Sequence, residues 1–78
     1  MTKEKFLANV RARVGERLAP MGKSKVDAFL DGADAVDVMS SAFKSAEKRF
    51  LLGGVAMNED AFWKSRVESA AECLTLLY

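Results

Sequence analysis

The chain has 78 residues, half of them hydrophobic, with 12 basic and 11 acidic side chains and no histidine. A chain of this length forms one domain that buries only about 60% of its unfolded surface, so its stability margin is small and dimerisation would add to it. The net charge of +1 gives no field that attracts nucleic acid or an anionic membrane. Without histidine, Ser-His and Cys-His catalytic pairs and histidine-containing zinc sites are excluded. We expect one domain over residues 1–78 that is not an enzyme and uses no cofactor and no metal.

The cysteine content and the first residues indicate the compartment. Cys73 is the single cysteine and has no partner for an internal disulfide, while residues 1–6 lack the apolar run of a signal peptide. No apolar stretch approaches the roughly 20 residues that cross a bilayer. We expect a cytoplasmic protein that does not enter a membrane.

Apolar residues at helical spacing predict a first helix over residues 3–19. They form one stripe: Phe6, Leu7, Val10, Val14 and Leu18. Thr2 is the expected N-cap, and Pro20 with Gly22 ends the helix. Ser24 is the expected N-cap of a short helix over residues 25–31, which Gly32 interrupts because glycine disfavours a helix interior.

The clearest pattern predicts a third helix over residues 35–52. Asp34 is the expected N-cap, and Gly53-Gly54 supplies the backbone freedom for a C-terminal stop. Five residues are expected on its buried side: Val36, Met39, Phe43, Ala46 and Phe50. The opposite side is expected to face solvent, and it carries six candidate partner-binding residues: Asp34, Asp37, Ser41, Lys44, Ser45 and Lys48.

Asn58 begins the predicted last helix, over residues 59–77. Its expected buried stripe contains Phe62, Trp63, Val67, Ala70, Leu74 and Leu77. We interpret Trp63 as a core residue and Cys73, close to the same side, as an inert small core residue. Leu76 points away from the stripe, so residues 74–78 are buried, frayed or part of an interface. No segment shows sustained alternation between hairpin turns. The fold class is therefore all-α, a small bundle of three main helices and one short helix.

Several segments together resemble the acyl carrier protein family. Residues 32–37, Gly-Ala-Asp-Ala-Val-Asp, are similar to its Gly-x-Asp-Ser-Leu-Asp loop, and residues 10–18 and 67–71 resemble the end of its first helix and the start of its last. Ala35 stands at the position of the serine whose oxygen carries the phosphopantetheine arm. Lys44 and Lys48 stand where the family carries acidic residues. The resemblance implies a degenerate or serine-blocked carrier-like bundle that docks on acyl-transfer enzymes, and it leaves open whether Ala35 is natural or engineered.

Two clusters of charged residues are candidates for a nucleic-acid site and a metal site. Residues 1–25 contain seven basic side chains and two glutamates, but helical spacing scatters them and no single basic ridge forms to follow a phosphate backbone. Asp27, Asp31, Asp34 and Asp37 would share one side only if residues 25–51 formed a continuous helix, and they lack the spacing of an EF-hand. Because these charges are scattered, nucleic acid is not the expected partner. A small DNA-binding regulator is therefore only the third hypothesis, behind the two that follow.

The sequence thus favours binding over catalysis. The leading hypothesis is a small non-catalytic protein–protein interaction module, a regulator or inhibitor of a macromolecular partner, that uses the exposed side of the third helix or the apolar carboxyl end. The carrier-like protein is the second hypothesis. The sequence does not choose between a monomer and a homodimer.

Overall fold

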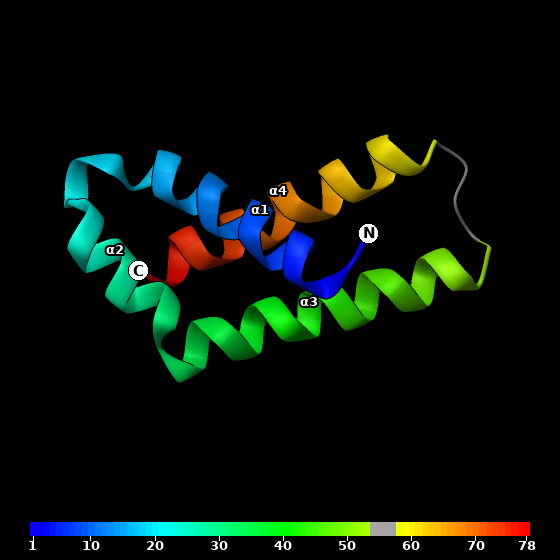
Figure 1. Cartoon of the computed structure of the whole chain (residues 1–78), viewed down its shortest axis with the longest axis horizontal. Helices are drawn as coiled ribbons and strands as arrows, with labels where there is room; N and C mark the ends of the chain where they lie inside the picture. The colour runs from blue at the N-terminus through cyan, green and yellow to red at the C-terminus, as the bar shows by residue number, and fades with distance from the viewer. Residues whose placement is uncertain (54–57) are drawn as a thin grey trace.

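A computed structural model describes residues 1–53 and 58–78. It contains four α helices: α1 (Lys3–Arg17), α2 (Lys23–Asp31), α3 (Ala33–Leu51) and α4 (Glu59–Leu77) (Figure 1). A 3-10 turn, η1 (Ala19–Met21), joins α1 to α2. No strand occurs among the described residues. The structure confirms the all-α bundle, with three long helices and one short one.

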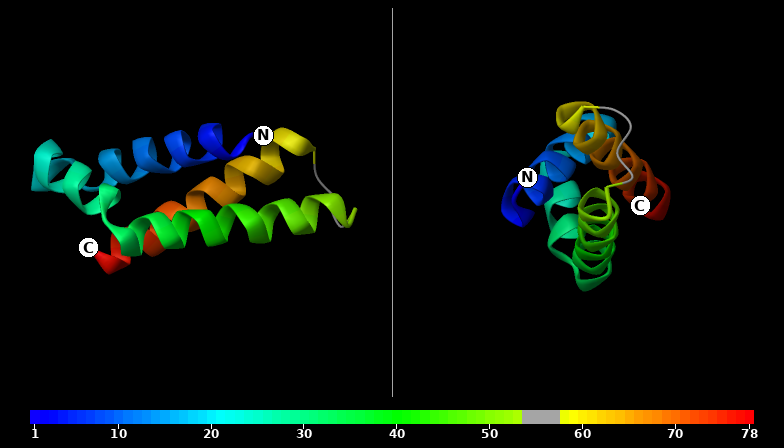
Figure 2. Two further views of the ribbon diagram at one scale, coloured as in Figure 1. Left: turned by 60° about the horizontal axis from the view of Figure 1, so that its bottom comes forward. Right: turned by 90° about the vertical axis from the view of Figure 1, so that its right-hand side faces the viewer.

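The three long helices lie side by side along a body of 39 × 21 × 20 Å. Figure 2 shows α1 and α3 on opposite sides of the view and α4 crossing between them, while α2 closes one end. The most extensive helix contact joins α1 to α4, and α3 packs against both. The carboxyl end lies beside α2, because the rings of Phe29 and Tyr78 meet edge to face with centroids 5.2 Å apart. One side of every helix is therefore committed to a shared core.

Helices α1 and α4 have the predicted side-chain N-caps, whereas α2 and α3 have no side-chain cap. Thr2 Oγ1 accepts a hydrogen bond from the Lys5 backbone N–H at 3.2 Å, and Asn58 Oδ1 accepts one from Ala61 at 2.7 Å. The predicted caps Ser24 and Asp34 are wrong, since the N-caps of α2 and α3 are Gly22 and Gly32 without a side-chain hydrogen bond.

Glycine geometry explains where α2 starts and where α3 stops. Gly22 has φ +95°, a left-handed conformation that glycine adopts without steric cost, so the chain turns there and α2 begins at Lys23. Helix α1 ends at Arg17 rather than at residue 19, because the following residues form η1. At the end of α3, Gly53 has φ +75°, in agreement with the predicted stop. Gly54 lies outside the described residues.

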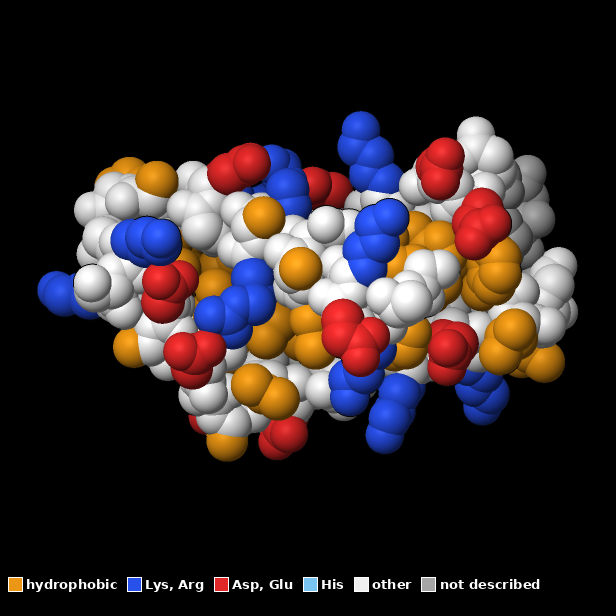
Figure 3. Space-filling view, in the orientation of Figure 1, with side chains coloured by type: hydrophobic (Ala, Val, Ile, Leu, Met, Phe, Trp, Pro, Cys, Tyr) orange, Lys and Arg blue, Asp and Glu red, His pale blue; other side chains and the backbone are white. Residues whose placement is uncertain are grey.

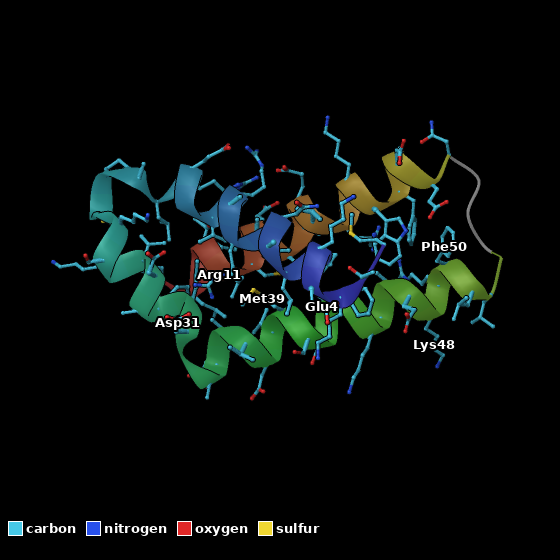
Figure 4. All side chains as sticks on the ribbon, in the orientation of Figure 1. Glu4, Arg11, Asp31, Met39, Lys48 and Phe50 are labelled. Atoms are coloured by element: carbon cyan, nitrogen blue, oxygen red, sulfur yellow. The ribbon has the colours of Figure 1, made fainter. Side chains whose placement is uncertain are left out.

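An aromatic cluster fills the centre of the core. The rings of Phe6, Phe43 and Trp63 lie with centroids 5.5 to 6.0 Å apart, one from each long helix. Phe50 and Phe62 extend the cluster towards one end of the bundle. Figure 4 shows Met39 lying between α3 and the rest of the bundle. Trp63 is 4% exposed, which confirms its prediction as a core residue.

Three predicted core positions are wrong. Val36 is exposed and its neighbour Ala35 is buried. The buried side of α3 runs through Ala35 and Met39, and Val36 points about 100° away from Ala35 around the helix axis. Cys73 is exposed, and so is Leu77. The buried stripe of α4 ends with Leu74, although Tyr78 still contacts Phe29 of α2.

The carboxyl end is helical to Leu77. Leu74 is fully buried, while Leu76 is 82% exposed, as its position away from the stripe predicted. Thr75 Oγ1 donates a hydrogen bond to the Ala71 carbonyl at 2.8 Å. The carboxyl end is thus a helical turn that exposes Leu76 and Leu77.

Candidate functional site

The side of α3 that points away from the bundle is the candidate site. Helix α3 packs into the core through Ala35, Met39, Phe43 and Ala46. A step of about 100° per residue places the predicted partner-binding residues on the opposite side. All six are exposed: Asp34, Asp37, Ser41, Lys44, Ser45 and Lys48. We call these six residues the outer face of α3. In Figure 4 the Lys48 label lies on the lower side of α3, away from the other helices.

The charges on the outer face of α3 are divided between its two ends. Asp34 and Asp37 lie in the first turns, and Lys44 and Lys48 in the later ones, an order that the helix dipole favours at both ends. Figure 3 shows basic side chains projecting below the C-terminal half of α3. Asp37 and Lys44 are seven residues apart, about 10 Å along the helix axis, which is too far for an ion pair. No ion pair within the described residues involves any of the four. Their charges therefore remain available to a partner.

The arginines of α1, by contrast, are used inside the molecule. Arg11 pairs with Asp31 of α2 at 2.9 Å, and Figure 4 shows the two side by side. Arg13 and Arg17 both contact Glu68 of α4, with one bond from each guanidinium at 3.1 and 3.0 Å. The hydrogen bonds from Arg13 and then Arg17 lower the pKa of Glu68, and the hydrogen bond to Glu68 raises the pKa of Arg13. The three arginines among the seven basic side chains of residues 1–25 therefore join helices.

The four aspartates weighed as a cation site do not share one helix side. Gly32 separates α2 from α3 with an extended backbone (ψ 153°), and Asp31 is paired with Arg11. Among residues 1–53 and 58–78, no three Asp, Glu, Cys or His side chains gather in a way that would hold a metal ion.

Apolar features lie beyond both ends of the outer face of α3. Leu51 and Leu52, just after Lys48, are 75% and 76% exposed. At the other end, a hollow of about 300 Å³ lies at the corner between α2 and α3, and we call it the α2–α3 hollow. Its lining residues are Ala28, Phe29, Gly32, Ala33, Asp34 and Ala35. Sequence reasoning missed both features, although two adjacent leucines at a helix end were a readable signal.

A larger groove of about 680 Å³ runs between α1 and α4. Lys5 and Lys64 line it together with Glu59 and Asp60, so its rim carries both signs of charge. Trp63 also lines it, and the indole Nε1 is buried without a hydrogen-bond partner among the described residues. Sequence patterns did not indicate this groove, because it arises from the packing of two helices that are distant in the chain.

Position 35 lies inside the packed core. Ala35 is 1% exposed and is the third residue of α3, so its Cβ points towards the other helices. A serine at this position would be buried, and its hydroxyl would face the core rather than an approaching enzyme.

Comparison with known protein families, with curated proteins and with solved structures finds no match for this chain. None of the helices in the described part of the chain combines the length and the apolar character needed to cross a membrane.

Proposed function

We propose that this protein is a non-catalytic protein-binding module, a regulator or inhibitor, that recognises a partner protein through the outer face of α3. One observation carries the proposal. Both signs of charge on that face are exposed and unpaired within the described residues, whereas the arginines of α1 are consumed in helix-to-helix contacts. Such a surface offers charge complementarity, which gives an interface its specificity and steers its encounters.

The chemistry of this face fits a protein better than a nucleic acid. A phosphate backbone calls for a run of positive charge, but Asp34 and Asp37 occupy one end of the face. The exposed Leu51 and Leu52 add apolar area beside the charges, as at interfaces that combine a desolvated centre with a polar rim. These features support a protein partner over the DNA-binding alternative.

The burial of Ala35 gives no support to a carrier role, because group transfer needs an accessible hydroxyl at that position. Docking on acyl-transfer enzymes through Lys44 and Lys48 would still be one form of the proposed binding. If the protein docks on acyl-transfer enzymes, affinity capture from the host lysate will recover them.

The test compares affinity capture from the host lysate by three forms of the tagged protein, with nuclease present throughout. They are the wild type, Lys44→Glu/Lys48→Glu on the outer face of α3, and the control Lys25→Glu/Lys64→Glu, which changes charge equally on α2 and α4. We expect a protein that the wild type and the control retain and that the outer-face variant loses. A partner that the outer-face variant retains but the control loses would refute the proposal.

A further inference from the structure

We propose that the outer face of α3 binds a second copy of this chain, with the two α3 helices antiparallel and a two-fold axis near Ser41. This inference rests on the proposed function, because it names the partner of the same surface. A two-fold interface is self-complementary, so that when one residue contacts another, the second contacts the first in return. The outer face of α3 meets that requirement through the order of its charges, its small central side chains and the apolar features beyond its two ends.

The charges are arranged symmetrically about Ser41 but with opposite signs. Asp34 and Lys48 lie seven residues on either side of it, and Asp37 and Lys44 lie four and three residues on either side. An antiparallel pair about Ser41 places Asp34 opposite Lys48 of the second copy and Asp37 opposite Lys44 of the second copy. Each pairing occurs twice, so every charge of the face gains a partner of opposite sign. A parallel pair would instead align aspartate with aspartate and lysine with lysine.

Small side chains lie at the centre of this arrangement. Ser41 lies on the exposed side of α3 between the acidic and the basic ends, and Ser45 follows one turn later, between Lys44 and Lys48. Helix axes approach to about 8 Å when the contact residues are small. The two Ser41 hydroxyls would face each other across the axis, where each can donate and accept a hydrogen bond.

The apolar ends complete the match. Leu51 lies ten residues beyond Ser41, about 15 Å along the helix axis, while Ala33 lies eight residues before it, about 12 Å. In the antiparallel pair each Leu51–Leu52 tip therefore falls within one turn of the α2–α3 hollow of the other copy. Asp34 belongs both to the outer face and to the lining of that hollow, so the hollow opens beside the contact surface. Phe29, half-buried in its wall, offers an apolar ring for the leucines.

Charge-reversal variants and their mixture test this geometry. One variant, Lys44→Asp/Lys48→Asp, makes the face wholly acidic, and the other, Asp34→Lys/Asp37→Lys, makes it wholly basic. Sedimentation equilibrium at low ionic strength then reports the mass of each variant and of an equimolar mixture, relative to the 8.5 kDa of one chain. Lys23→Asp/Lys25→Asp is the matched control on α2, and circular dichroism verifies that all variants keep the helical content of the wild type.

We expect the wild type and the control to form dimers that weaken with added salt. Each outer-face variant should dimerise at least about tenfold more weakly, because like charges then oppose each other across the interface. The mixture of the two variants should recover a dimer. Recovery distinguishes a face-to-face contact from general damage to the fold, since two misfolded variants would not restore each other.

Two results would overturn the inference. One is a wild type that stays monomeric up to about 1 mM at low ionic strength, a range that detects Kd values of that order. The other is a dimer whose affinity neither charge reversal alters, which would place the interface elsewhere. A monomeric wild type whose outer face still captures a host protein would overturn the second copy as partner and leave the proposed function standing. A monomer that also captures no host protein through this face would remove both.

Discussion

Replacing Ala35 by serine distinguishes the carrier resemblance from the observed packing. Ala35 is 1% exposed and lies one turn before Met39 on the buried side of α3. The substitution restores the serine of the family pattern within Gly32–Asp37. In this structure it places a hydroxyl on the buried side of α3, in the wall of the α2–α3 hollow, where residue 35 exposes too little surface for a transferase to reach.

The loss of stability expected for Ala35→Ser follows from the free-energy cost of burying the serine hydroxyl. Burying a hydroxyl without a full complement of hydrogen bonds costs about 1–3 kcal/mol in proteins. A chain of 78 residues has a free energy of unfolding of about 4–12 kcal/mol, at about 0.05–0.15 kcal/mol per residue. Each kcal/mol lost lowers the Tm of a domain of this size by about 4–8 °C. We therefore expect Ala35→Ser to lower the Tm by at least several degrees.

The assay combines thermal unfolding, followed by circular dichroism, with mass spectrometry after incubation with a broad-specificity phosphopantetheinyl transferase. Val36→Ser is the matched control, because Val36 is 40% exposed on the same turn and its replacement should change stability by no more than about 0.5 kcal/mol. We expect Ala35→Ser to be destabilised and unmodified. A variant as stable as the wild type that gains the full mass of the arm would refute the buried placement of residue 35.

Three further predictions test the core, a cap and the interhelical ion pairs. Phe43→Ala should lower the free energy of unfolding by about 3–5 kcal/mol, as for other buried aromatics; a loss below about 1 kcal/mol in urea unfolding would contradict the aromatic core. Asn58→Ala should cost about 1 kcal/mol, and a negligible change would argue against the cap on Ala61. The pKa of Glu68 is lower in the folded protein, so its stabilisation is complete above the ordinary glutamate value of about 4.3 and is lost as the pH falls through the lower folded value. The Tm advantage of the wild type over Glu68→Gln should therefore shrink as the pH falls from about 6 to about 3; an advantage that stays constant would count against this linkage.

Local chemistry made the helices predictable from the sequence. Thr2 and Asn58 act as caps because the hydrogen bond of an N-cap spans only three residues. The stripe of α1 and the placement of Trp63 followed from helical spacing alone. The exposure of the six residues on the outer face of α3 followed in the same way, since the side opposite a buried stripe faces solvent.

Predictions of burial were wrong where the exposure of a side chain depends on how its helix packs against its neighbours. Val36 and Ala35 lie three and four residues before Met39, so spacing alone allows either to be buried, and packing against the neighbouring helices buries Ala35. Gly32 rather than Asp34 is the N-cap of α3. Cys73 carries an apolar character that periodicity alone assigns near the core. Its exposure depends on which side α4 turns towards its neighbours, because the next residue, Leu74, is fully buried; that orientation is a property of the packed bundle.

The sequence by itself determined the fold class, the four helices and the outer face of α3, because capping and helical periodicity act over a few residues. The tertiary structure alone decided that the arginines of α1 pair with Asp31 and Glu68, while the charges on the outer face of α3 stay unpaired within residues 1–53 and 58–78. It also placed Ala35 in the core and formed the α2–α3 hollow. Contacts of this kind join residues that are remote in the chain, and their geometry exists only once the helices have packed.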